Sequence, residues 1–305
     1  MDRQKFTLYT SLVLAMLFWG FTFVFYKYAF QSFKPLTIII FRLSISVVFI
    51  YLASVLLKKT QKVSKKDFKY LILLAFFEPF LYFLGETYGM ELVSSTLGAV
   101  IIATIPLIVP IGAYVFFSER LSRINLLGLF ISSVGVVAVI TTGEGEWYVT
   151  LKGTILMFLA VFSAVGYTLL VKKLVDSYNG FTITIWQNLF GAAMIFPVFS
   201  IFEFRHAVST TPSLNPLLAL IYLGVFGSSI TFILFTRAVR ELGAAKANIF
   251  ANLIPVFTAV TAFFMLKEEM PLMKVAGIAL VLGGLILSQL GTFKRKNRTR
   301  IKLRP

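Results

Sequence analysis

The stretch IPLIVPIGAYVFFSERLSRINLLGLFISSVG at residues 105–135 returns later in the chain as IPVFTAVTAFFMLKEEMPLMKVAGIALVLGG at residues 254–284. Both stretches are strongly apolar, and four residues recur at a single spacing of 149 positions. The recurring pairs are Pro106 and Pro255, Glu119 and Glu268, Gly128 and Gly277, and Gly135 and Gly284. Because all four pairs share one register, the pattern predicts an internal duplication.

A shorter echo near the start of each half supports the duplication. Residues 14–27 read LAMLFWGFTFVFYK, and residues 159–172 read LAVFSAVGYTLLVK, at a slightly different spacing. We therefore expect a first five-helix repeat over residues 1–145 and a second over residues 146–293. A basic cytoplasmic tail then follows over residues 294–305.

The composition places the chain in a membrane. Hydrophobic residues make up 58% of the sequence, charged residues only 14%, and the mean hydropathy is +0.87. A soluble domain has about 25% charged residues and about 45–50% apolar ones. A water-soluble fold of this length could not cover so much apolar surface, so lipid must surround much of it.

Ten apolar segments approach the ~20 residues that a membrane-spanning helix needs. They are Leu8–Phe30, Leu36–Leu57, Tyr70–Met90, Val93–Phe117, Ile124–Thr142, Gly153–Val171, Phe181–Phe204, Pro216–Thr236, Gly243–Leu266 and Leu272–Gly291. The first segment is too long for the apolar core of a signal peptide, so we interpret it as a span. The expected fold is an all-α integral membrane protein with ten transmembrane helices.

The basic residues predict the orientation. The net charge of +16 comes from lysines and arginines that gather between apolar segments, above all in the loop Lys58–Lys69 and in the tail. This distribution is typical of cytoplasmic loops and not of a nucleic-acid-binding surface. We therefore expect a multi-pass protein of the cytoplasmic membrane with both termini in the cytoplasm and no nucleic-acid partner.

Five spans per repeat is an odd number, so the second repeat must enter the membrane in the opposite orientation. Inverted repeats around a cavity at the membrane midplane are a transporter architecture. When the two halves exchange conformations, the cavity opens alternately to each side. The duplication therefore predicts two inverted five-helix repeats and transport by alternating access.

Several chemistries are not expected. The chain has no cysteine and a single histidine, His206, so we predict no metal site, no catalytic residues and no cofactor. The phosphate-binding pattern GxxxxGK[ST] is absent from the sequence, so the chain is not expected to hydrolyse ATP. The prediction is that the protein is not an enzyme.

Four groups of residues resemble the EamA-type branch of the drug/metabolite transporter superfamily. They are Phe18-Trp19-Gly20, Phe41-Arg42-Leu43, and the paired blocks Pro106…Glu119…Gly128 and Pro255…Glu268…Gly277. The resemblance extends over nearly the whole chain. It implies a ten-helix carrier of the cytoplasmic membrane, usually an exporter of amino acids, other metabolites or drugs. Gln187 departs from the pattern because it stands roughly where Arg42 stands in the first repeat.

Arg42, Glu78, Tyr82 and Glu86 are the polar side chains expected inside the membrane. A charge at that depth costs at least a few kcal/mol unless it is paired, and Arg42 and Glu86 lie at comparable depths. We expect these two to form an ion pair, which either supports the structure or binds substrate. Glu78, Tyr82 and Glu86 recur every four residues and share a helix face. Glu78 then serves proton coupling or cation recognition, or is a neutral group that locks helices together.

Other residues are predicted to line the cavity or to bend the helices around it. Trp19 lies near the middle of its span, and Gln187 and Asn252 are amides within apolar helices. Each of these three either contacts substrate or packs between helices. Pro106 and Pro255 remove backbone donors at matched positions, which predicts a shared hinge or cavity wall.

The function predicted from these features is secondary transport, in the form of export of small metabolites, such as amino acids or related compounds, or of drugs. The alternatives are a membrane channel and a lipid flippase built on the same helices. The expected partners are a small-molecule substrate, protons as a coupling ion and the lipid bilayer. The sequence leaves the oligomeric state open.

Overall fold

The computed structural model describes residues 3–118, 122–141, 151–267 and 269–302, and these residues form helices and turns without strands. Eight helical segments are long and apolar enough to cross a membrane. They are Lys5–Ala29, Pro35–Leu56, Lys65–Leu92, Ser95–Phe117, Leu151–Leu174, Gly180–Phe202, Leu214–Leu242 and Ala244–Leu266. The expected all-α membrane fold is confirmed. The predicted fifth and tenth spans correspond to shorter apolar segments, Arg123–Gly135 and Leu272–Ser288, so the count of ten remains a prediction.

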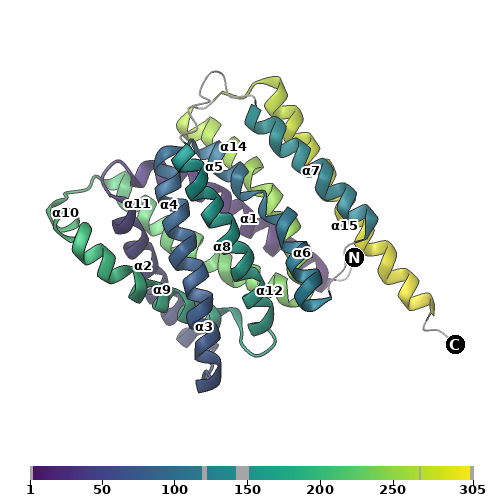
Figure 1. Ribbon diagram of the computed structural model, residues 1–305, viewed down its shortest axis with the longest axis horizontal. Coiled ribbons are helices and arrows are strands. Elements are labelled where there is room, and N and C mark those ends of the chain that lie inside the picture. The colour runs from purple at the N-terminus through teal and green to yellow at the C-terminus, as the bar shows by residue number, and fades with distance from the viewer. Residues whose placement is uncertain (1–2, 119–121, 142–150, 268, 303–305) are drawn as a thin grey trace.

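The longer helices follow the order of Figure 1. They are α1 (Arg3–Ala29), α2 (Pro35–Leu56), α3 (Phe68–Ala75), α4 (Tyr82–Leu92), α5 (Ser95–Ile102), α6 (Ile105–Phe117), α7 (Arg123–Thr141), α8 (Leu151–Leu174), α9 (Gly180–Phe202), α11 (Leu214–Tyr222), α12 (Thr231–Leu242), α13 (Ala244–Ile249), α14 (Ile254–Leu266) and α15 (Leu272–Lys302). Residues 119–121, 268 and 303–305 are not described, so Glu119, Glu268 and the end of the predicted tail lie outside the described residues.

The two halves break their helices at matching places. A π-helical segment, η2 (Phe76–Leu81), joins α3 to α4, and a second, η3 (Leu223–Ile230), joins α11 to α12. Likewise α6 and α14 begin 149 residues apart, each with its proline in the first turn, where the missing N–H costs no helical hydrogen bond. Both helices end on a residue with left-handed backbone, Ser118 (φ 53°) and Lys267 (φ 61°).

Helix contacts also come in matching sets. Helix α1 is equivalent to α8, and α4 is equivalent to α12. In the first matching set, α1 packs against α14, and α8 packs against α5 and α6. In the second, α4 packs against α8, and α12 packs against α1. Equivalent helices meet each other directly in two places, α2 with α9 and α7 with α15. The contacts are those of two similar halves related by an approximate twofold axis.

Helices α7 and α15 run antiparallel at one edge of the molecule (Figure 1). Gly128 lies against Gly284, and Gly135 lies against Gly277. A Cβ atom at Gly284 would come within 2.6 Å of the Gly128 carbonyl oxygen, and one at Gly135 within 2.6 Å of the Gly277 carbonyl oxygen. Glycine is required here because the two backbones touch.

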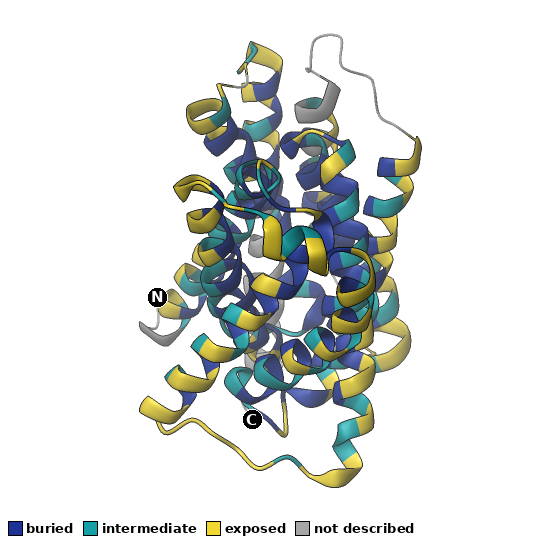
Figure 2. Cartoon of the chain, turned by 90° about the vertical axis from the view of Figure 1, so that its left-hand side faces the viewer, coloured by how far each residue is buried: buried dark blue, intermediate teal, exposed yellow. Residues whose placement is uncertain are grey.

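Burial follows the membrane pattern. Figure 2 shows buried residues toward the interior of the bundle and exposed residues on its outer faces and loops. Many of the exposed side chains are large and apolar, for example Ile111, Phe130 and Ile201, which are 65%, 66% and 76% exposed. Large apolar side chains on the outside are expected where lipid is the solvent.

Candidate functional site

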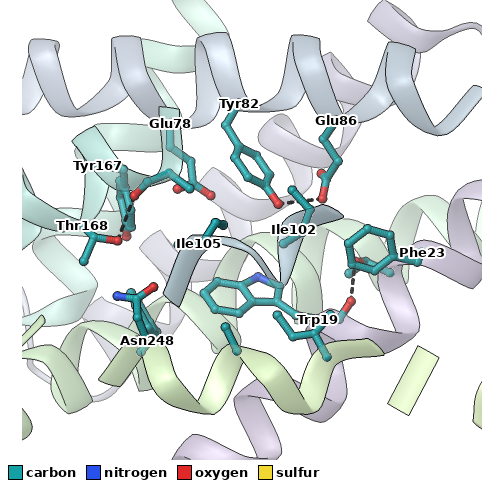
Figure 3. A pocket seen from close by; sticks show the side chains of 15 residues that line it. Trp19, Phe23, Glu78, Tyr82, Glu86, Ile102, Ile105, Tyr167, Thr168 and Asn248 are labelled. Atoms are coloured by element: carbon teal, nitrogen blue, oxygen red, sulfur yellow. Dashed lines mark hydrogen bonds between the residues drawn. The ribbon is translucent and has the colours of Figure 1, made fainter. Parts of the chain in front are cut away.

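A cavity lies at the centre of the bundle, between the two halves (Figure 3). Its free volume is about 40 Å³, which is room for about three water molecules. It is lined by Trp19, Thr22, Phe23, Glu78, Tyr82, Glu86, Ile102, Ile105, Ala164, Tyr167, Thr168, Phe235, Asn248, Ala251 and Ile254. Figure 3 shows Glu78, Tyr82 and Glu86 extending from one wall toward Trp19 and Asn248 on the other.

Most of the lining residues are related by the repeat. Those of α1 are matched in α8 at a shift of 145, and those of α4, α5 and α6 are matched at a shift of 149. The matched pairs are Trp19 and Ala164, Thr22 and Tyr167, Phe23 and Thr168, Glu86 and Phe235, Ile102 and Ala251, and Ile105 and Ile254. The cavity therefore lies on the approximate twofold axis. Glu78, Tyr82 and Asn248 lack a lining counterpart.

Glu78 enters the cavity where its helix is interrupted. Its backbone is extended (φ −146°, ψ 117°) inside η2, and Pro79 follows it. The side chain is almost fully buried, with 5% of the residue exposed. Within the described residues, no side chain or backbone group hydrogen-bonds to the Glu78 carboxylate, and Figure 3 shows the side chain between Tyr167 and Tyr82.

Glu86, one turn beyond Tyr82, is fully partnered. Its Oε1 accepts a hydrogen bond from the Tyr82 hydroxyl at 2.9 Å, and its Oε2 accepts one from the Tyr26 hydroxyl at 2.7 Å. Arg42 Nη1 lies 3.4 Å from the same Oε2 and also donates to the Tyr26 hydroxyl. The two charges are buried together, which the low dielectric tolerates only when their hydrogen bonds are satisfied.

The guanidinium of Arg42 has three further contacts. Its Nε donates to Ser228 Oγ of the second half at 2.8 Å. Its Cζ lies 3.8 Å from the centre of the Phe83 ring and 5.4 Å from the centre of the Tyr26 ring. The chain thus already holds one buried cation between a carboxylate and aromatic faces.

The predicted site residues fall into two groups. Trp19, Glu78, Tyr82 and Glu86 line the cavity, and the Trp19 indole donates to the Gly227 carbonyl oxygen at 3.2 Å. Arg42, Gln187 and Asn252 lie behind the lining.

Gln187 is completely buried, and neither of its side-chain polar atoms has a hydrogen-bond partner in the described residues. The Asn252 amide donates to Ser132 Oγ of α7 at 2.7 Å. Pro106 and Pro255 directly follow the lining residues Ile105 and Ile254. Both prolines begin helices, so they leave the following helices α6 and α14 regular.

Sequence reasoning did not select Tyr167, Phe235 or Asn248 for the cavity. Phe235 could have been found from the repeat, because it is the counterpart of the predicted residue Glu86. Tyr167 is the counterpart of Thr22, which was not predicted either. Asn248 lies four residues before Asn252, so a regular α-helix would place both amides on one face. The conformation of the residues between them decides which amide faces the cavity. The 3₁₀ segment η4 (Phe250–Leu253) turns more per residue than an α-helix and rotates the two amides apart.

Side-chain bonds join the two halves at both ends of the bundle. At the end where α3 begins, the Tyr178 hydroxyl donates to Asp67 Oδ2 at 2.6 Å, which raises the pKa of Tyr178, and Arg240 donates to the Tyr178 carbonyl oxygen. At the other end, Glu203 Oε2 accepts from the Thr37 backbone N–H at 2.7 Å and so caps α2. None of these residues lines the central cavity.

The lining has the chemistry of a binding site. It combines five aromatic rings with carboxylates, and no group of three His, Cys, Asp or Glu residues that could hold a metal occurs in the described part of the chain. A mostly apolar cavity with a few convergent polar groups is the usual form of a small-molecule site.

Comparison with known proteins decides the family. The model of the EamA-like transporter family matches the chain twice, over residues 7–141 and 151–290. The chain belongs to the EamA-like transporter family. It is therefore a transporter of the drug/metabolite transporter superfamily, and the two matches coincide with the two similar halves.

Curated relatives support the same assignment. An uncharacterized transporter of Archaeoglobus fulgidus is 26% identical over 276 residues, which cover 90% of this chain and 96% of that protein. The uncharacterized transporter YetK of Bacillus subtilis is 26% identical over 80% of this chain and 74% of that protein. A probable terminal-alkyne amino-acid exporter of Streptantibioticus cattleyicolor is 27% identical over 65% of each chain. A solved crystal structure has a similar fold, with a TM-score of 0.77 at 15% identity, covering 93% of this chain and 98% of that one.

Proposed function

We propose that this EamA-family protein is a secondary carrier that exports a small metabolite, such as an amino acid or a related compound, or a drug, by alternating access. One observation carries the proposal: the central cavity is lined by equivalent residues from both halves. If the two halves exchange conformations, the open end of the bundle closes and the closed end opens. The cavity then faces the other side of the membrane without moving.

The proposed exchange requires the repeats to be inverted. The antiparallel contact of α7 with α15 supports inversion, because equivalent helices of two parallel repeats would run the same way. We assign the repeats to residues 1–145 and 146–293, with a basic tail over 294–305 and both termini in the cytoplasm. Pro106 and Pro255 are the proposed hinges, because each marks the restart of its helix beside the cavity.

Export is the proposed direction. The family relative from Streptantibioticus cattleyicolor, described as a probable terminal-alkyne amino-acid exporter, supports it. The energy source proposed is the proton gradient, with Glu78 as the group that binds and releases the proton. A buried carboxylate without a partner is costly when ionised and is readily neutralised by a proton. The Arg42–Glu86 pair stays fixed, because each of its charges is already balanced by the other.

Counterflow in proteoliposomes tests the carrier. A screen of thermal stability against amino acids, nucleosides and hydrophobic cations first selects a ligand, since binding stabilises the folded form. Labelled ligand should then enter vesicles preloaded with unlabelled ligand faster than it enters empty vesicles. Uptake that is indifferent to preloading and carries ionic current at channel rates would contradict the carrier.

Glu78→Gln tests the proton assignment. The variant should exchange ligand but lose acceleration of transport by a pH gradient. Glu91→Gln is the matched control, because Glu91 lies in the same membrane-spanning segment, Lys65–Leu92, at an exposed position outside the cavity. Proton-driven transport that survives in Glu78→Gln would remove the coupling role from this residue.

A further inference from the structure

We infer that the cavity binds organic cations, namely compounds with one ammonium group on an apolar or aromatic body, in preference to compounds that carry a carboxylate. This inference rests on the proposed function, since it names the substrate class of the same cavity. It comes from the balance of hydrogen-bond donors and acceptors in the lining.

The lining contains one carboxylate that has no hydrogen-bond or ion-pair partner among the described residues. Glu86 already contacts Arg42 and the hydroxyls of Tyr26 and Tyr82, so its charge and its lone pairs are used within the protein. Glu78 has no such contact in the described residues. A cation that enters the cavity would therefore find one uncompensated carboxylate at its wall.

The lining offers almost no free donors. No lysine or arginine lines the cavity. The side-chain donors of the lining bond to the protein itself, through Tyr82 to Glu86, Thr22 to the Trp19 carbonyl, Thr168 to the Ala164 carbonyl, Trp19 to the Gly227 carbonyl and Asn248 to the Ala244 carbonyl. Only the Tyr167 hydroxyl and the second N–H of the Asn248 amide lack a partner among the described residues, and both are uncharged donors. A substrate carboxylate would thus lose its water without gaining charged donors, which is costly.

The aromatic rings complete the match. Trp19, Phe23, Tyr82, Tyr167 and Phe235 line the same cavity as Glu78, and Figure 3 shows Tyr82 and Tyr167 on either side of it. Aromatic faces attract ammonium groups, and they pack against an apolar substrate body. The same combination already holds the Arg42 guanidinium between Phe83, Tyr26 and the lining residue Glu86.

Glu78 also has no counterpart in the second half, where Gly227 stands at the equivalent position. The cavity therefore has one carboxylate available and binds one positive charge at a time. A proton and an ammonium group exclude each other on that carboxylate. Cation binding would release the proton, as the proposed proton exchange requires.

Three matched ligands test the inference. All three share a phenyl ring and a two-carbon chain. Phenethylamine carries one positive charge, 3-phenylpropionate carries one negative charge, and phenylalanine carries both. We expect phenethylamine to bind the purified protein at least tenfold more tightly than phenylalanine, with no measurable binding of phenylpropionate. Thermal shift and intrinsic tryptophan fluorescence measure this at equilibrium, without a gradient.

Two variants locate the binding. Glu78→Gln should lose the phenethylamine shift, and Glu91→Gln should keep it. The unfolding temperature without ligand shows that each variant is folded. Binding of phenylpropionate or phenylalanine as tightly as the amine would overturn the inference, as would an unchanged amine shift in folded Glu78→Gln.

The outcome is separable from that of the proposed function. If proteoliposomes exchange another solute by counterflow and amines fail to bind, the carrier stands and the substrate class is wrong. If phenethylamine binds through Glu78 but shows no counterflow, the site stands and the carrier is wrong.

Discussion

Behind the cavity, the first half buries Arg42, and the second half buries Gln187 at the equivalent position 145 residues later. Arg42 contacts Tyr26, Glu86 and Ser228, whereas both polar atoms of Gln187 lack a partner in the described residues. At this pair of positions, the first half thus has a charged side chain with several polar partners, and the second half has a neutral amide held by packing. The duplicated folds have diverged in what stabilises them.

The comparison also separates two uses of charge. Arg42 and Glu86 neutralise each other behind the wall and fix the helices of the first half. Glu78, one helical break away, faces the cavity without a partner and is free to act on whatever enters. Only the second arrangement leaves a charge available for transport.

The largest expected effect comes from removing the buried cation. Arg42→Met leaves the buried carboxyl group of Glu86 without its charged partner and should lower the free energy of unfolding by about 3–5 kcal/mol. Gln187→Met is the matched change in the second half and should be neutral or stabilising, because it removes two unsatisfied polar atoms. Unfolding in SDS titrations measures both.

The double variant Arg42→Met/Glu86→Gln sharpens this result. Because it removes both charges, it should be more stable than Arg42→Met alone. Equal losses in Arg42→Met and Gln187→Met would contradict the difference between the halves.

The next effect concerns the contact of α7 with α15. Gly284→Ala places a Cβ atom 2.6 Å from the Gly128 carbonyl oxygen and should cost about 1–3 kcal/mol. Gly283→Ala is the control from the adjacent position, where a Cβ meets nothing within 4 Å. It should be neutral or stabilising by up to ~1 kcal/mol, since alanine favours the helix over glycine. Matching losses in the two variants would show that the close contact is absent.

The smallest effect compares two buried tyrosines. Tyr26→Phe removes a hydroxyl that bonds to Glu86, Thr87 and Arg42 and should cost about 1–3 kcal/mol. Tyr167→Phe removes a hydroxyl without a partner in the described residues and should change stability by less than about 0.5 kcal/mol. Thermal unfolding of both variants, followed by tryptophan fluorescence, ranks them. A larger loss of stability in Tyr167→Phe than in Tyr26→Phe would contradict the assignment of hydrogen-bond partners to these two hydroxyls.

Sequence reasoning reached the fold because hydropathy and the repeat are properties of the chain alone. The 149-residue spacing predicted the duplication, whereas the matched backbone at Ser118 and Lys267 and the contact of Gly128 with Gly284 are seen only in the structure. Helix periodicity also brought Glu78, Tyr82 and Glu86 to one wall, even though η2 interrupts the helix between them.

The rest depended on tertiary packing. Tyr26 completes the Arg42–Glu86 pair only because α1 is rotated to face α4, which no local pattern specifies. The choice of Asn248 over Asn252 depends on the extra rotation in η4. Both side-chain polar atoms of Gln187 lack a hydrogen-bond partner because of the residues that pack around it in the fold, which the local sequence does not reveal.

The central claim of alternating access is tested most directly by distances at the two ends of the bundle. The chain has no native cysteine, so pairs of spin labels can be attached without background. One pair, Lys66→Cys with Glu241→Cys, reports the end where α3 begins, and the other, Glu91→Cys with Ser213→Cys, reports the opposite end. We expect one distance to lengthen as the other shortens between pH 5 and pH 8 and on addition of phenethylamine. Two distances that stay fixed under all these conditions would contradict the account.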